Sequence, residues 1–144
     1  MNYSSLALAA LGGTVASFGY GFLLMWLLPA LFEAPLKYPG VFRAKEEMMS
    51  VAPVGFGSSI VAIVVVTIIF AMTHHRGSGA MEGAMEGARL GVLIGIFAIC
   101  NVAHNYMNLN INFNFSLQQA ATYFVQWVIT CIVIGLIYNP PAAS

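Results

Sequence analysis

The chain has 144 residues, of which 60% are hydrophobic and only 7% are charged. A soluble domain usually carries about 25% charged residues, so lipid rather than water must cover most of this surface. Five Lys and Arg residues balance five Asp and Glu residues. This zero net charge argues against a protein that binds nucleic acid through a basic surface.

Four apolar segments are long enough to cross a bilayer, which takes about 20 residues of helix. They cover residues 6–32, 51–73, 88–106 and 117–138. Within lipid the backbone polar groups need internal partners, and these segments lack the alternation of barrel strands. We therefore predict an all-α integral membrane four-helix bundle, a single transmembrane domain over residues 1–144, with short loops and both termini on the same side.

The ends of these segments give further expectations. No Lys or Arg precedes the first segment, so we expect it to stay in the protein rather than be removed as a signal peptide. In the first loop, residues 43–49 form either a short interfacial helix or a solvated link. In the third loop, Asn alternates with apolar residues over 108–115, which predicts an extended stretch. The Lys and Arg residues divide too evenly between the two sides to orient the protein.

A glycine at every fourth position marks the start of the third segment. The glycines are Gly79, Gly83, Gly87, Gly91 and Gly95. A step of four residues turns only about 40° around a helix, so they line one face, a glycine zipper. Such a face lets two helix backbones approach closely. It packs either against another helix of the same chain or against a second copy, as an oligomer interface.

Polar residues on the third and fourth segments predict a seam between these two helices. By helical periodicity they face each other at matched depths, and they are Asn101, Asn105, Gln119, Tyr123 and Gln126. Polar groups within a membrane need partners. The seam is either a set of hydrogen bonds that fixes the fold or a binding site for a small polar or amphipathic molecule.

The first two segments each offer a face of small or polar residues. These are Gly13, Ser17, Tyr20 and Gly21 on the first segment, and Gly55, Ser59 and Ala62 on the second. We expect both faces to point into the bundle and to complete its interior.

The sequence offers little catalytic chemistry. No carboxylate lies deep in a segment, and no familiar hydrolase or phosphate-binding motif is present. His74 and His104 belong to opposite ends of the third helix and its preceding loop, so they cannot share a metal. Cys100 and Cys131 lie in apolar runs and form no CxxC pair. We therefore predict no catalytic residues, no cofactor and no metal site.

Several stretches resemble a bacterial family of small four-helix membrane proteins catalogued as domain of unknown function 1761. The stretches are Gly19-Tyr20-Gly21-Phe22, the run from Gly87 to Gly95, Asn105-Tyr106, and Tyr123 with Gly135 and Tyr138. The resemblance implies the same four-helix architecture and a location in the bacterial inner membrane. That family has no established activity, so the resemblance implies no reaction.

Three functional hypotheses follow from the sequence. The first is a non-enzymatic homo-oligomer or accessory subunit of a membrane complex, whose partners are lipids, itself or other membrane subunits. The second is binding or transport of a small polar or amphipathic molecule through the polar seam. The third is an enzyme that acts on a lipid-soluble substrate.

Overall fold

The computed structural model describes residues 2–74 and 79–138. Four long helices dominate this part of the chain: α1 (Tyr3–Leu27), α3 (Lys45–Thr73), α4 (Ala80–Asn108) and α5 (Phe113–Ile137). Two short helical segments, α2 (Pro29–Glu33) and η1 (Ala34–Lys37), lie between α1 and α3. All four long helices are long and apolar enough to cross a membrane. The predicted all-α, integral membrane fold is confirmed.

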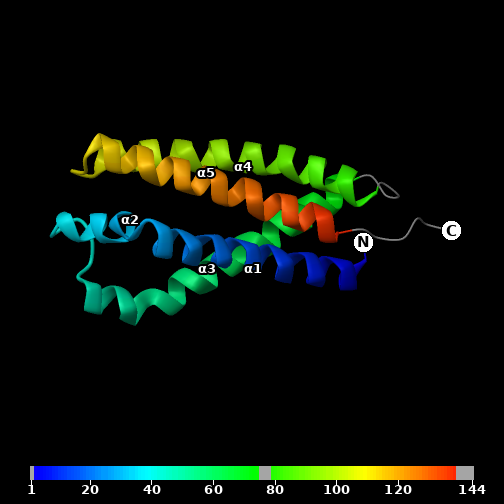
Figure 1. Cartoon of the computed structure of the whole chain (residues 1–144), viewed down its shortest axis with the longest axis horizontal. Coiled ribbons are helices and arrows are strands. Elements are labelled where there is room, and N and C mark those ends of the chain that lie inside the picture. The colour runs from blue at the N-terminus through cyan, green and yellow to red at the C-terminus, as the bar shows by residue number, and fades with distance from the viewer. Residues whose placement is uncertain (1, 75–78, 139–144) are drawn as a thin grey trace.

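Figure 1 shows how the helices are arranged. α4 and α5 lie side by side as an antiparallel pair, α1 packs against α5, and α3 crosses α1 at an angle. The start of α1 and the end of α5 lie at the same end of the bundle, as predicted (Figure 1). The first loop and the connection between α4 and α5 lie at the opposite end.

The first loop differs from its prediction. α1 ends at Leu27 because the residue before Pro29 is driven out of the helical region, and Leu28 has φ −134° and ψ 61°. Residues 29–32, expected to continue the first span, instead belong to the separate helix α2. Residues 43–49 form no separate interfacial helix, because α3 already begins at Lys45. Glu46 and Glu47 in its first turn suit the positive end of the helix dipole.

The third loop is shorter than predicted. The expected extended stretch over 108–115 is wrong for its second half, because α5 begins at Phe113. The Asn112 side chain accepts a hydrogen bond from the Asn114 backbone N–H at 2.8 Å. This cap satisfies one of the free N–H groups at the start of a helix and so favours helix over strand.

Aromatic residues tie the first loop to the start of α5. The rings of Tyr38 and Phe42 lie 5.6 and 5.7 Å from the ring of Phe115, between centroids. The Asn112 backbone N–H donates to the Tyr38 hydroxyl at 3.1 Å. The two loops at this end of the bundle are therefore joined through side chains.

The glycine face of α4 lies against α5 of the same chain. A Cβ built on Gly87 would overlap the Cys131 carbonyl oxygen, and one on Gly91 would lie 2.7 Å from the Val128 Cα. Gly83 meets the backbone of Gly135, and Gly95 meets a ring. Four of the five glycines thus allow the two helices to approach closely, and their face is covered within the chain. Gly79 has no described atom within 4 Å of such a Cβ.

The core lies where α3 crosses α1 and α5. It contains Ala9, Ile63, Phe70, Cys131 and Ile134, each at most 1% exposed. Between Lys45 and Ala62, all of which are described, no residue of α3 is buried.

The small-residue faces of α1 and α3 differ from their prediction. Gly13 and Ser17 are buried, as expected for an inward face. Gly55 was also expected to point inward, but it is exposed, and no described atom lies within 4 Å of the position that a Cβ would take there. The reason is that the first half of α3 diverges from the other helices before it reaches the crossing (Figure 1).

Candidate functional site

The predicted seam residues do not gather between α4 and α5. Asn101 and Asn105 are exposed, Tyr123 is 43% exposed, and Gln119 and Gln126 are half-buried. Among the described residues, no hydrogen bond joins any two of these five side chains. The contact face of α4 drifts around the helix with each four-residue step, and at this depth Val102 is the buried residue. Asn101 is its neighbour in sequence and so points about 100° away.

Gln126 instead joins α5 to α1. Its side-chain N–H donates to the Ser17 hydroxyl at 2.8 Å, and Ser17 is buried. Hydrogen bonds of this kind between membrane helices are worth about 0.6 kcal/mol on average. One of the five predicted residues therefore contributes to helix packing, on a different face from the one predicted.

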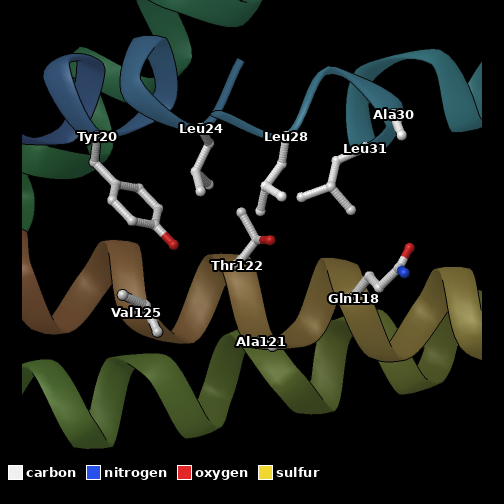
Figure 2. A pocket seen from close by; sticks show the side chains of 9 residues that line it. All are labelled: Tyr20, Leu24, Leu28, Ala30, Leu31, Gln118, Ala121, Thr122 and Val125. Carbon is white, nitrogen blue, oxygen red and sulfur yellow. The ribbon is translucent and has the colours of Figure 1, made fainter. Parts of the chain in front are cut away.

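A cavity of about 430 Å³ lies between α1, α2 and α5, and we call it the α1–α5 groove (Figure 2). Its volume falls within the ~300–1,000 Å³ range of small-molecule sites. The nine residues that line it are Tyr20, Leu24, Leu28, Ala30, Leu31, Gln118, Ala121, Thr122 and Val125.

The break between α1 and α2 shapes the groove. The wall from α1 carries Leu24 and the helix-ending residue Leu28, and α2 extends it with Leu31. The opposite wall is α5, where the small residues Ala121 and Thr122 leave space. Figure 2 shows the side chains of the upper wall pointing toward α5. The leucines of α1 and α2 face the small residues of α5, and the space between them is the cavity.

Three hydrogen-bonding side chains line this otherwise apolar cavity. Tyr20 projects from α1 toward α5, Thr122 projects from α5 toward α1, and Gln118 lies one turn from Thr122 on α5 (Figure 2). Within residues 2–74 and 79–138, no hydrogen bond is formed by the side chains of these three residues. Thr14, Thr67 and Thr73 bond to the backbone of their own helices, whereas the buried Thr130 on α5 has no described hydrogen-bond partner.

The groove residues on α5 were missed by sequence reasoning. Gln118, Thr122 and Val125 follow the i, i+4, i+7 spacing of one helix face, but that face borders the one assigned to the seam. Tyr20 was correctly expected to face the bundle interior. The signal that could have located the cavity is Pro29, because a helix that stops there must change direction.

A second polar cluster lies at the other end of the bundle. His74 is buried, and its Nδ1 lies 2.6 Å from the Glu86 Oε2. The His74 ring stacks on Phe70 with centroids 5.0 Å apart and meets Tyr138 edge-on at 5.8 Å. This cluster connects the end of α3 to the start of α4. His75 and Arg76 lie outside the described residues, and the described part of the chain contains no set of three metal-ligating side chains.

Comparison with known proteins finds no family model, no curated protein and no solved structure that matches this chain. The resemblance to the bacterial family of unknown function therefore stays a prediction. The α1–α5 groove is interpreted from its own geometry and chemistry.

Proposed function

We propose that this integral membrane protein binds one lipid-soluble, amphipathic molecule in the α1–α5 groove and performs no chemistry on it. The observation that carries this proposal is the set of three hydrogen-bonding side chains, Tyr20, Thr122 and Gln118, without a described partner in an apolar cavity. Polar groups are costly in a membrane and usually mark a partner or a function. The sequence also predicted binding of an amphipathic molecule as its second hypothesis. That hypothesis placed the site between the third and fourth spans, whereas the groove lies between α1, α2 and α5.

The direction of the groove supports an amphipathic ligand. Gln118 lies near the start of α5, at the end of the bundle where the loops meet, and Val125 lies seven residues deeper. At 1.5 Å per residue, this separates them by about 10 Å along the helix. The groove therefore extends from the membrane surface toward the middle of the bilayer. We place the protein in the bacterial inner membrane as part of the same proposal.

Filling the groove is expected to abolish binding. Photolysis of a long-chain alcohol with a diazirine in its chain should label wild-type peptides that contain Leu24, Leu28 or Val125, in detergent or nanodiscs. The variant Ala121→Phe places a ring in the cavity, so labelling at these positions should fall to background. The matched control is Ala103→Phe, because Ala103 lies exposed on α4, away from the groove.

Mass spectrometry of the labelled peptides decides this test. Uniform label over all lipid-facing residues, unchanged in Ala121→Phe, would show that the alcohol reacts only from the bulk bilayer. That result would remove the proposed function. Label confined to the groove in both wild type and Ala103→Phe supports it.

A homo-oligomer or accessory subunit is the second candidate. It is supported by the first half of α3, where no residue from Lys45 to Ala62 is buried. Gly55 and Gly57 lie in this stretch, and no described atom is within 4 Å of the place where a Cβ would be. This half of α3 is covered only in part, by the contact of the Phe56 ring with Phe18 of α1 at 5.5 Å between centroids. Small residues on a largely exposed membrane helix favour close packing with another helix.

Gly55 and Gly57 point about 200° apart on α3, so a double variant probes opposite sides of this half of the helix. The double variant Gly55→Leu, Gly57→Leu is expected to reduce the particle size in mild detergent if the first half of α3 holds subunits together. The measurement is size-exclusion chromatography with light scattering. Gly19→Leu serves as the control, because Gly19 is also exposed but lies on α1. A monomeric wild type, or an assembly of unchanged size in the double variant, counts against this candidate.

A further inference from the structure

We infer that the ligand of the α1–α5 groove is an uncharged lipid whose head carries carbonyl or hydroxyl oxygens. This inference rests on the proposed function and narrows its ligand class. It excludes anionic phospholipids and fatty acids as specific occupants. Three properties of the groove lead to it: its charge, its hydrogen-bonding groups and its opening.

The lining of the groove carries no charge. Of its nine residues, all within the described part of the chain, none is Lys, Arg, Asp or Glu. Moving a phosphate or carboxylate from water into such a site costs desolvation free energy, and the lining has no positive charge to offset that cost. Sites for anionic lipid heads are normally basic. The groove therefore favours neutral heads over anionic ones.

The polar groups of the groove match oxygen atoms. The hydroxyls of Tyr20 and Thr122 each donate one hydrogen bond, and a carbonyl oxygen has two lone pairs. Because these two side chains project from opposite walls, each hydroxyl can donate to an oxygen of a ligand that lies between the walls (Figure 2). Gln118 lies one turn farther toward the surface and offers both a donor and an acceptor to a second polar position.

The rest of the lining suits a hydrocarbon body. Leu24, Leu28, Leu31 and Val125 supply its apolar contacts. Leu28 and Val125 remain 51% and 41% exposed, so the cavity opens on the surface that the bilayer covers. A lipid therefore enters sideways from the membrane and does not need to cross the loops.

A competition series tests the inference on the full chain in detergent micelles. The diazirine-bearing alcohol labels the groove, and four compounds with the same ten-carbon chain compete: 1-decanol, 2-decyl-1,4-benzoquinone, decyl phosphate and decane. The first two should displace the label at concentrations at least about tenfold lower than the last two require, which corresponds to about 1.4 kcal/mol. Decanol and the quinone distinguish a hydroxyl head from a carbonyl head, and displacement by either supports the inference.

Variants that remove single polar groups provide the second measurement. Tyr20→Phe, Thr122→Val and Gln118→Leu should each weaken competition by the preferred neutral compound about fivefold, the loss of one hydrogen bond. Tyr123→Phe and Gln119→Leu are matched controls outside the groove lining and should leave competition unchanged. Thermal unfolding in the same detergent identifies any variant that does not fold. If a variant does not fold, the competition series on the wild type alone tests the inference.

The outcomes separate the two proposals. Equal displacement by decanol and decyl phosphate, or unchanged competition in all three folded variants, overturns the inference while the labelled groove keeps the proposed function. Absence of groove labelling in the wild type overturns the proposed function itself.

Discussion

Replacing Gly87 by alanine is expected to destabilise the protein by about 3 kcal/mol, the upper range for overpacking a closely packed site. The Cβ of alanine would overlap the Cys131 carbonyl oxygen, and the Cys131 carbonyl carbon and the Ile132 Cα are also close. Backbone atoms cannot move aside as a flexible side chain can, so α4 must shift away from α5. Thermal or SDS-induced unfolding of the detergent-solubilised protein measures the loss.

The control for this prediction is Gly55→Ala on α3. No described atom lies within 4 Å of the added carbon there, and alanine is favoured over glycine within a helix by about 1 kcal/mol. This variant should leave stability unchanged or raise it. Equal stability of Gly87→Ala and Gly55→Ala would contradict the close backbone contact between α4 and α5.

Replacing His74 by alanine is expected to destabilise the protein by about 2–4 kcal/mol, as for breaking a buried polar pair and opening a cavity. The substitution removes the 2.6 Å contact with Glu86 and the ring that stacks on Phe70. Because this cluster joins the end of α3 to α4, the crossing of α3 over the bundle should loosen. The same unfolding measurement applies, with cysteine cross-linking between the two helices as a local readout.

His104→Ala is the matched control, since His104 is exposed at the far end of α4. It should change stability by less than about 0.5 kcal/mol. If both histidine variants unfold alike, the His74–Glu86 contact does not hold α3 in place. Glu86→Gln separates charge from shape, because it retains an acceptor oxygen near the His74 ring.

The architecture was predictable because backbone polar groups within lipid need hydrogen-bond partners in the same protein, which few structures provide. Long apolar segments without alternation must become helices, and their even number places the start of the first and the end of the last at the same end of the bundle. The ends of the helices were less predictable, since they depend on local details. Pro29 stops α1 early, and the Asn112 cap starts α5 within a stretch whose alternation suggested a strand.

The polar seam was not predictable from periodicity, because counting 100° per residue treats each helix as straight and its contact face as fixed. The glycine face of α4 winds slowly around the helix. At the level of Asn101, the residue that faces the protein interior is therefore Val102. Gln126 instead donates a hydrogen bond to Ser17 of α1, which lies 109 residues away in the chain. Contacts at such a separation depend on which helices become neighbours.

The groove depends on three helical segments at once, so no single segment reveals it. His74 and Glu86 were closer to prediction, because only 12 residues separate them along the chain, between the end of α3 and the first turns of α4. A search for a histidine at the end of one segment and a carboxylate near the start of the next identifies this pair. Spacing within α4 alone instead favours Arg89, three residues after Glu86, as its partner and leaves His74 without one.

The aromatic contact between the first loop and Phe115 has a consequence for the affinity of the proposed ligand. Tyr38 and Phe42 anchor the end of the segment that follows Pro29, and α1 anchors its beginning. A wall tethered at both ends keeps its distance from α5 whether or not a molecule lies between them. The lipid proposed to bind there would then meet a site already at its final width, and the protein would lose little conformational entropy on binding.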